Sequence, residues 1–416
     1  MNIVLVNHYA GSPEHGMEFR PHQFARRWVK DGHDVTILAA SFSHLRNRNP
    51  SVQGRSREEF IDGIRYRWLK TPRYLGNGLA RIRSIHAFLR GIDRERRGFL
   101  ADRRVDAVIA SSTYPFDIDP CRRLASDRGA TLVWEVHDLW PLSPIELSGF
   151  SPRHPFIRIT QRAEDRCCRD ADLVVSILPR AIDHLRTRGL DPDRYVHIPN
   201  GAEAETESPG NTKEAKIIAR HQASGRFTVV YAGGHGRYHA LGDLISAAVR
   251  LPTSDFAFVL IGDGTHKDHL RQMASRHPEV KIDFLDRVPR SIAMAALQQG
   301  DAIFAGLAEH SLFRFGIGPN KLFDGMLAGR PIVAAYSAGN DPVKEAGCGL
   351  SVPAADVDAL VSALIHLRGL DPEARKRMGE AGESHVRRHH DYGELAREFI
   401  AAIDSKRIGT NPGVDS

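Results

Sequence analysis

Several features that define other protein classes are missing from this sequence. Its four cysteines, Cys121, Cys167, Cys168 and Cys348, form no C-x-x-C pair, which excludes a disulfide framework and a cysteine zinc site and fits a reducing cytoplasm. No apolar run approaches the roughly 20 residues of a membrane-spanning helix, and no signal peptide opens the chain. No Asp-x-Asp follows a strand, as a metal-dependent enzyme would need, so we expect neither a metal nor a cofactor.

The remaining composition is that of a globular protein, with 42% hydrophobic and 26% charged residues. A chain of 416 residues is long enough for two α/β domains of about 200 residues each, both with a sizeable core.

The net charge of +6 is concentrated in the first part of the chain. Residues 1–110 hold 20 Lys and Arg against 11 Asp and Glu, mostly within 55–73 and 81–104. The second segment predicts a basic amphipathic helix, because Ile82, Phe88 and Ile92 recur among its arginines. Such a helix could rest on anionic lipid headgroups, or its apolar stripe could pack on its own domain. We expect no nucleic-acid partner, because no motif of a nucleic-acid-binding fold accompanies the charge.

Short apolar runs alternate with helix-length segments along the chain, and they are apolar on both faces, as strands of a parallel sheet must be. In the first half the predicted strands are Asn2–Asn7, Val35–Ala39, Ala107–Ser111, Leu132–Val136 and Leu173–Ile177. In the second half they are Thr228–Ala232, Ala257–Ile261, Ile282–Leu285, Ala302–Ala305 and Ile332–Ala335. Two such patterns in succession predict two doubly wound, Rossmann-like α/β domains.

We place the domains at residues 1–200 and 201–390, with a helix at 391–408 that can pack back on the first domain. The polar segment 201–226 holds the linker near its start. Ligands of open parallel sheets bind beyond the carboxyl ends of the strands, so loops from both domains are expected to converge on a cleft between them.

The segment from Gly316 to Val333 is the most informative of these loops. Helical spacing of apolar residues predicts a helix with Pro319 at its first position and Gly329 at its end. The N–H groups of Asn320, Lys321 and Leu322 would be unpaired at this helix start, and such groups bind phosphate readily. We therefore assign Gly318, Asn320 and the Lys321 ammonium to a diphosphate. Asp324, one turn further along the helix, could bind a sugar hydroxyl. This pattern suggests a nucleotide-sugar site, although it also occurs on ordinary surface helices.

Glycine-bearing loops supply the other expected ligand contacts. Gly234 and Gly236 lie between a strand and a helix and can let backbone approach a pyrophosphate, which Arg237 would neutralise together with Lys321. A tight connection without ligand is the alternative explanation. Gly262 belongs to a Gly-Asp-Gly turn that carries no chemistry of its own. Gly11 and Gly16 lie on a loop after the first strand, where a substrate could approach.

His137 and Asp138 follow a strand of the first domain. The imidazole could hydrogen-bond the transferred sugar or help the acceptor hydroxyl to lose its proton, and Asp138 is the rival base. Glu135 falls on the same side of the strand as His137. The chain has 21 histidines, so a purely structural role is the alternative for any one of them.

These residues resemble a known family. The whole chain resembles a family 4 glycosyltransferase of the GT-B fold, in which two Rossmann-like domains face each other across a cleft, and it is most similar to the bacterial polysaccharide branch that includes fucosamine-type transferases. The matching segments are HYAGSPEHGMEFRPHQFARRWVKDGHDVTIL, VWEVHDLWP, VHIPNGAE, VVYAGGHGRYHALGDLISAA, LIGDG and GPNKLFDGMLAGRPIVAA.

The resemblance implies sugar transfer from a UDP- or GDP-sugar with retention at the anomeric carbon, without a bound metal, to a lipid-linked or saccharide acceptor. Asp324 stands where the family's second glutamate binds the ribose, Lys321 and Arg237 would face the diphosphate, and His137 would touch the donor sugar. The corresponding location is the cytoplasm, peripheral at the inner face of the membrane.

The sequence departs from the family pattern at two positions. Gly316 stands where the family has a sugar-binding glutamate, so Arg314 or the backbone N–H groups of residues 316–318 would have to take its role. His239 replaces a lysine that the family pairs with the arginine at Arg237. The alternatives are a nucleotide-sugar 2-epimerase of the same fold and a non-catalytic protein that binds nucleotide sugars.

Overall fold

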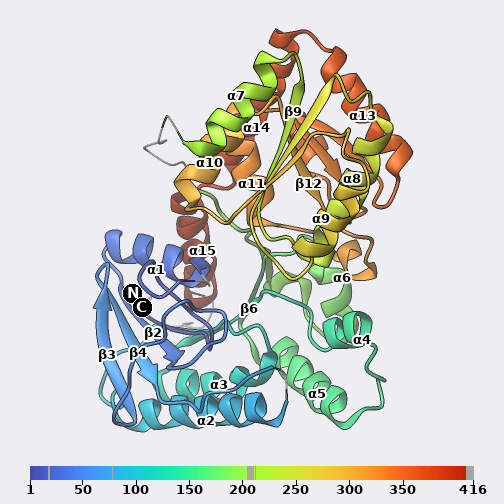
Figure 1. Ribbon diagram of the computed structural model, residues 1–416. Helices are drawn as coiled ribbons and strands as arrows, with labels where there is room; N and C mark the ends of the chain where they lie inside the picture. The colour runs from blue at the N-terminus through green and yellow to red at the C-terminus, as the bar shows by residue number, and fades with distance from the viewer. Residues whose placement is uncertain (17–18, 77, 204–209, 211, 409–416) are drawn as a thin grey trace. The chain divides into compact units, whose positions relative to one another are not determined.

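The computed structural model describes residues 1–16, 19–76, 78–203, 210 and 212–408, and the chain divides into two compact units. Unit 1 comprises Met1–Asn200 with Tyr392–Ser416, and unit 2 comprises Gly201–Asp391. Each unit has a largely parallel sheet with helices on its faces, so the prediction of two doubly wound α/β halves is confirmed (Figure 1).

Unit 1 is built on a sheet that, within the described residues, runs in the order β3-β4-β2-β1-β5-β6-β7-β8. Its strands are β1 (Asn2–Val6), β2 (Asp34–Ala40), β3 (Ser56–Ile61), β4 (Ile64–Leu69), β5 (Ala107–Ala110), β6 (Thr131–Val136), β7 (Leu173–Ser176) and β8 (Tyr195–His197). The sequence analysis missed β3 and β4, which form an antiparallel hairpin. Asp62 and Gly63, both at positive φ, close its turn, so much of the basic segment 55–73 is a hairpin.

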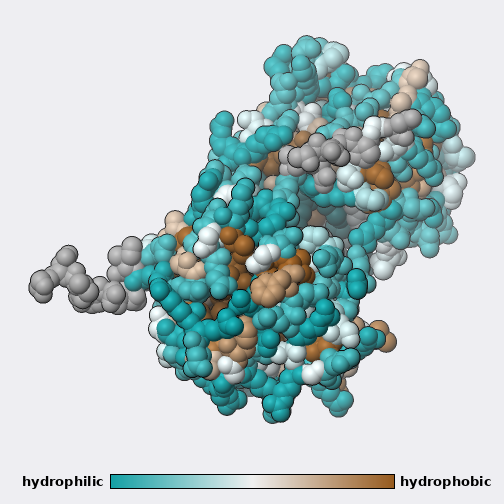
Figure 2. Space-filling model, turned by 90° about the vertical axis from the view of Figure 1, so that its left-hand side faces the viewer, coloured by the Kyte–Doolittle hydropathy of each residue, from teal (hydrophilic) through white to brown (hydrophobic). Residues whose placement is uncertain are grey.

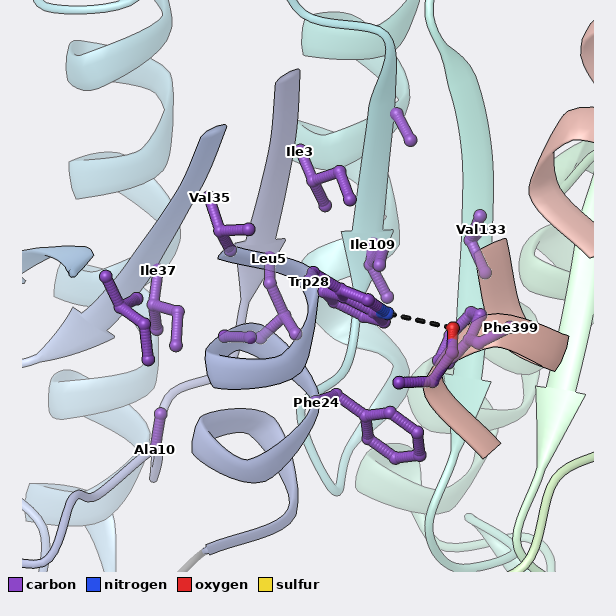
Figure 3. Packing of buried hydrophobic residues seen from close by; sticks show 14 of the residues in the cluster. Ile3, Leu5, Ala10, Phe24, Trp28, Val35, Ile37, Ile109, Val133 and Phe399 are labelled. Carbon is purple, nitrogen blue, oxygen red and sulfur yellow. Dashed lines mark hydrogen bonds between the residues drawn. The ribbon is translucent and has the colours of Figure 1, made fainter. Parts of the chain in front are cut away.

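The helices of unit 1 include α15 from beyond unit 2. They are α1 (Phe19–Lys30), α2 (Leu79–Arg97), α3 (Ile118–Arg128), α4 (Leu142–Ser148), α5 (Pro155–Asp170), α6 (Ala181–Leu185) and α15 (Tyr392–Ile408). Phe24 and Trp28 of α1 pack against Phe399 of α15 over the sheet, and the Trp28 indole N–H donates to the Ala396 carbonyl at 3.1 Å (Figure 3). The core of unit 1 therefore joins segments more than 300 residues apart in sequence.

Part of the apolar stripe of α2 packs on its own unit. Phe88 and Ile92 are fully buried, which favours own-domain packing, one of the two alternatives, for this part of the stripe. Ile82 of the same stripe is exposed (49%), as are Leu79 at the first position of the helix (74%) and Leu75 before the helix (95%). Within the described residues no helix is long and apolar enough to cross a membrane. The molecular face in Figure 2 is mainly hydrophilic, with apolar residues at the surface in separate patches.

Unit 2 is built on a sheet in which every pairing is parallel, ordered β11-β10-β9-β12-β13-β14 within the described residues. Its strands are β9 (Phe227–Ala232), β10 (Phe256–Ile261), β11 (Ile282–Leu285), β12 (Ala302–Gly306), β13 (Ile332–Ala335) and β14 (Gly349–Val352). Successive strand residues enter different cores, as the two-residue period of a strand requires. Val229 packs in one core and Val230 in the other.

The helices of unit 2 cover both faces of its sheet. They are α7 (Lys213–Ala223), α8 (Leu241–Arg250), α9 (Lys267–Ser275), α10 (Arg290–Gln299), α11 (Asn320–Leu327), α12 (Pro342–Ala346), α13 (Val357–Gly369) and α14 (Pro372–His389). The segment 201–226 is more than a linker, because it contains α7, which Thr212 caps and Ile218 anchors in the core. Residues 204–209 and 211 of that segment lie outside the described residues.

Candidate functional site

The carboxyl ends of β9, β12 and β13 border a cavity of about 240 Å³ in unit 2. The helix after β9, α8, packs in one core and α11, after β12, in the other, so the cavity lies where the winding of the sheet reverses. Open α/β sheets bind their ligands at this point. The cavity is lined by Tyr231, Ala232, His239, Leu297, Ile303, Phe304, Ala305, Gly306, Leu307, Pro319, Asn320, Lys321, Leu322 and Tyr336.

The start of α11 reaches this cavity. Pro319 is the residue before the first helical position, at φ −73° and ψ 124°, rather than that position itself as predicted. The Leu322 N–H donates to the Pro319 carbonyl, which removes one of the three N–H groups expected to be open. The N–H groups of Asn320 and Lys321 have no hydrogen-bond partner among the described residues. Two backbone donors therefore remain at a helix end that favours negative charge.

Lys321 lies across the glycine-rich loop that follows β9. A Cβ atom at Gly233 would lie 2.7 Å from Lys321 Cδ, so a side chain at this position would displace the end of Lys321 from its observed place. The Lys321 Nζ lies 3.2 Å from His239 Nε2 and 6.0 Å from the centre of the Tyr231 ring. No ion pair with a carboxylate is formed by Lys321 within the described chain. Desolvation lowers its pKa from the ordinary value, which is the electrostatic cost of a cation held without a counter-charge.

His239 is neutral at physiological pH. Burial, reinforced by the nearby Lys321 ammonium, lowers the pKa of His239 to about 4. A neutral ring at this position can accept the hydrogen bond that the ammonium donates. The positive charge here therefore comes from Lys321 rather than from His239.

Two glycine-rich turns pack directly against each other. Gly262 is buried at φ +146°, and a Cβ there would lie 1.8 Å from the Gly233 carbonyl oxygen. A Cβ at Gly264 would lie 2.6 Å from the His235 backbone. Close backbone packing accounts for glycine at both positions, and contact of Gly262 with a nucleotide stays a prediction.

Gly234 and Gly236 border the same loop without such constraint, because a Cβ at either position would meet neighbours no closer than 3.6 Å. Arg237 follows them, is exposed, and forms no ion pair within the described residues. The structure therefore brings these glycines, His239 and Lys321 together. It also leaves the guanidinium two residues before His239 open to an anion.

Asp324 lies on α11 but does not line the cavity. Its Oδ1 accepts a hydrogen bond of 2.6 Å from Arg290 Nη2, and Arg290 also donates to the Glu203 carbonyl. Asp324 is 26% exposed. The sequence analysis gave no role to Arg290. Binding of a ribose by Asp324 stays a prediction.

The segment at Gly316 is committed to internal hydrogen bonds. The Gly316 N–H donates to the Phe313 carbonyl at 2.9 Å, and the Ile317 N–H donates to Asn340 Oδ1 at 2.7 Å. Arg314 donates to the Ser311 carbonyl and lies over the Phe315 ring. The backbone N–H groups of residues 316 and 317 are therefore occupied, which corrects the expectation that they replace the missing glutamate.

A polar network joins the carboxyl ends of β1, β5 and β6 in unit 1. Ser111 Oγ donates to Glu135 Oε2 at 2.6 Å, lies 3.0 Å from His137 Nε2, and accepts from Asn7 Nδ2 at 3.3 Å. Arg20 Nε donates to Glu135 Oε1 at 2.9 Å. Burial opposes ionisation of Glu135, but Arg20, His137 and Ser111 outweigh it and hold the pKa of this carboxyl well below its usual range.

His137 has one ring nitrogen in this network and one outside it. Nε2 lies 3.3 Å from Glu135 Oε2, and the side chain is 10% exposed. Nδ1 has no hydrogen-bond partner within the described residues. The sequence analysis identified His137 but did not foresee that Glu135, Ser111 and Arg20 hold it.

Asp138, the rival base, has a structural role next to His137. Its Oδ1 accepts from the Leu139 N–H at 2.9 Å and from the Ser143 hydroxyl at 2.5 Å. Burial raises the pKa of Asp138 despite these hydrogen bonds. One carboxylate oxygen is thus used to fix the turn that leads into α4.

The two glycines of the loop after β1 are buried. The Gly11 carbonyl accepts from the Tyr66 hydroxyl at 2.9 Å, and Gly16 lies at φ +77° against the Asn47 side chain. Packing and backbone conformation account for both residues. Contact of Gly11 and Gly16 with a substrate stays a prediction.

Metal-ligating and thiol groups were also located. Among the described residues no group of three or more His, Cys, Asp and Glu side chains is placed to hold a metal ion. All four cysteines are buried and unpaired.

Comparison with known proteins finds matches for both halves of the chain. The glycosyl transferase 4-like domain model matches residues 15–201, and the glycosyl transferases group 1 model matches residues 226–369. The "Probable glycosyltransferase WbjE" of Pseudomonas aeruginosa is 23% identical over 376 residues, which cover 89% of this chain and 90% of that protein.

Two solved structures show the same fold. Sucrose-phosphate synthase from Thermosynechococcus elongatus superposes with a TM-score of 0.72 at 15% identity, over 98% of this chain and 100% of that one. Anabaena Alr3699/HepE in complex with UDP gives 0.66 at 15% identity, over 97% and 100%. The chain has the GT-B fold, and the matches support a glycosyltransferase.

Proposed function

We propose that this chain is a retaining glycosyltransferase that moves a sugar from a UDP- or GDP-sugar to a lipid-linked or saccharide acceptor in polysaccharide or glycolipid assembly. The observation that carries the proposal is the uncompensated positive charge at the switch-point cavity of unit 2. Lys321 lines this cavity beside two open N–H groups of α11, and Arg237 precedes the lining residue His239 by two positions. Both are cations without an ion-pair partner among the described residues. A nucleoside diphosphate supplies the missing counter-charge, and the UDP found in the Anabaena structure favours this ligand class.

The chemistry follows from that placement. As the bond between the anomeric carbon and the diphosphate breaks, negative charge grows on the departing phosphate oxygen. Lys321, Arg237 and the α11 N-terminus stabilise this charge more in the transition state than in the ground state. The acceptor oxygen bonds to the anomeric carbon on the face that the phosphate leaves, and the phosphate takes the hydroxyl proton. Retention results, and no metal is needed to neutralise the leaving group.

Unit 1 contributes His137, whose Nδ1 can hydrogen-bond a hydroxyl of the transferred sugar or of the acceptor. Asp138 is less suited to act as a base, because one of its oxygens already holds Leu139 and Ser143. The matched models describe glycosyl transferases, which does not favour the 2-epimerase.

The test has two steps. A thermal-shift screen of UDP- and GDP-sugars should find a donor that raises the melting temperature by mass action. That donor is then incubated with candidate acceptors, and NMR of the product should show an unchanged anomeric configuration. A 2-epimer formed in acceptor-free buffer would replace this proposal with the epimerase. Binding without turnover under every acceptor would leave a non-catalytic protein.

Contact with an anionic membrane is proposed at the start of α2. Leu79 and Ile82 in the first turn of the helix form the α2 tip, which is exposed, and the exposed face of the helix continues with Arg83 and Arg90. Leu75, in the segment before the helix, is exposed as well. These two arginines form no ion pair within the described part of the chain. Apolar side chains beside unpaired arginines suit the boundary between acyl chains and anionic headgroups.

Liposome flotation tests this contact. The chain should float with vesicles that contain anionic lipid, and less so with zwitterionic vesicles or in high salt. Leu79→Ser should reduce flotation, whereas Ile365→Ser, at an exposed apolar residue of unit 2, should not. Equal flotation by both variants would remove the α2 tip from the proposal.

A further inference from the structure

The polar network of unit 1 fixes where the hydrogens lie. The Glu135 carboxylate is ionised, so its oxygens can only accept hydrogen bonds. The single hydroxyl hydrogen of Ser111 is donated to Glu135 Oε2 at 2.6 Å. Ser111 Oγ, which lies 3.0 Å from His137 Nε2, can therefore only accept a hydrogen bond from it. Nε2 is then the donor and must carry a hydrogen.

The hydrogen-bonding groups of Ser111 Oγ and of the Asn7 side chain are all in use. Ser111 Oγ donates once and accepts twice, from His137 Nε2 and from Asn7 Nδ2. The Asn7 amide also donates to the Ser111 carbonyl, and its Oδ1 accepts from the Tyr9 N–H. The ring cannot exchange its nitrogens without leaving an acceptor facing an acceptor, which is costly for buried groups.

Arg20 secures the carboxylate from the other side. Its Nε donates to Glu135 Oε1, while its Nη1 and Nη2 donate to the Pro199 and Ile198 carbonyls at 2.6 and 2.8 Å. The side chains of Arg20 and Glu135 are 5% and 1% exposed. A guanidinium with three such bonds holds the carboxylate in one orientation, and the carboxylate in turn orients the imidazole.

We propose that Glu135 and Ser111 are positioning residues that keep the His137 hydrogen on Nε2 and so present Nδ1 to a hydroxyl of the sugar or of the acceptor. This inference rests on the proposed glycosyl transfer for the identity of that hydroxyl, but the state of the ring itself does not depend on it.

Other charged groups facing His137 are few. Glu135 lies on β6, two residues before His137, with Arg20 from α1 paired to it. Asp117 from the turn before α3 and Asp138 act on His137 at longer range. Burial raises the pKa of Asp117 to about 7, so it is largely protonated below that pH. Glu135 is thus the dominant negative partner of the ring.

NMR of the chain labelled with ¹⁵N and ¹³C in histidine tests the proposal without any substrate. The His137 signals are identified by their loss in His137→Asn. In the unsubstituted chain the neutral ring should show a protonated Nε2 and a bare Nδ1. In Glu135→Gln the neutral ring should shift towards the tautomer protonated at Nδ1, because the amide has one acceptor oxygen where the carboxylate has two.

Two further variants keep the test decisive. Ser111→Ala leaves the Arg20–Glu135 pair in place and should give a mixture of the two neutral tautomers, even if Glu135→Gln does not fold. Glu164→Gln is the matched control, because Glu164 is fully buried and pairs with His184 at 2.9 Å in the same unit. It should alter the His184 signals and leave those of His137 unchanged.

A bare Nε2 in the unsubstituted chain would overturn the proposal. An unaltered tautomer of His137 in folded Glu135→Gln would do the same. If NMR shows the expected tautomer of His137 but the chain transfers no sugar, the proposed glycosyltransferase activity is refuted and the inference about His137 stands.

Discussion

The charged side chains near the carboxyl ends of the two sheets differ in whether they have partners. In unit 1, Ser111, Glu135 and Arg20 satisfy one another in a buried network that leaves one nitrogen of His137 open. In unit 2, Lys321 and Arg237 remain without a counter-charge among the described residues. A network whose hydrogen bonds are all satisfied holds its side chains in one geometry. A cation without a counter-charge can instead stabilise the negative charge of a ligand that binds later. Substitutions should therefore affect stability on one side and activity on the other.

The largest effect is expected at Arg20. Arg20→Met removes the partner of a buried carboxylate, so it should lower the free energy of unfolding by about 3–5 kcal/mol. Chemical denaturation followed by tryptophan fluorescence measures this change. Arg57→Met, at an exposed ion pair of the same unit, serves as the control and should change stability by less than about 1 kcal/mol. A similarly small loss of unfolding free energy in both variants would show that the buried network stabilises the fold no more than an exposed ion pair does.

Lys321→Ala should have the opposite profile. Turnover should fall by about 3 kcal/mol in activation free energy, the scale of one preorganised charge in the transition state. Stability should hardly change, because the desolvated ammonium forms no ion pair within the described chain. Steady-state kinetics and a melting curve give both quantities, with the exposed Lys344→Ala as control. Unchanged turnover would remove Lys321 from the site.

Asp324→Ala should act on nucleotide affinity. If Asp324 binds the ribose, calorimetry with the nucleoside diphosphate should show a loss of about tenfold, which equals about 1.4 kcal/mol. Asp358→Ala, in another ion pair of unit 2, should leave the affinity as it is. Equal affinity in both variants would mean that Asp324 only anchors Arg290.

The smallest effect concerns pH. The pKa of His239 is lowered to about 4 in the folded chain, so between its ordinary value near 6.5 and 4 the unfolded chain binds more protons. Stability should therefore fall as the pH falls from 7 to 5. The share of His239 should be below about 1 kcal/mol, because the ring is partly exposed. His239→Asn should lose less stability over this interval than the unsubstituted chain, and an equal loss would contradict the lowered pKa.

Local sequence patterns predicted much of unit 2. Buried strands and the helix at 320–327 follow from apolar periodicity, and the charge of Lys321 at a helix start is visible without coordinates. In unit 1 the hairpin of β3 and β4 was missed, although Asp62-Gly63 between alternating residues is a hairpin signal. We interpreted this segment by its many arginines and overlooked its alternating apolar and polar residues.

Long-range pairings could not be read from a single sequence. Arg20 and Glu135 are 115 residues apart, and nothing in either segment indicates the other. The same holds for Asn340, which takes the Ile317 N–H that was expected to face a sugar. The close approach of Gly262 to the Gly233 carbonyl could not be predicted either, because the two glycines belong to different strand-end loops. Such contacts depend on the sheet order, which periodicity does not determine.

The return of α15 to unit 1 has a consequence for how the chain matures on the ribosome. Phe399 and Ile403 belong to the same core as Trp28, so the first unit lacks part of its interior until residues 392–408 have been made. Unit 2 is complete once Asp391 has emerged, and its two ends are already held together by the Ala202–Asp391 bridge. N-terminal units usually fold first during synthesis. Here the core of unit 2 can be completed before the core of unit 1. A ribosome that stops shortly after Asp391 would carry a complete unit 2 and an open unit 1.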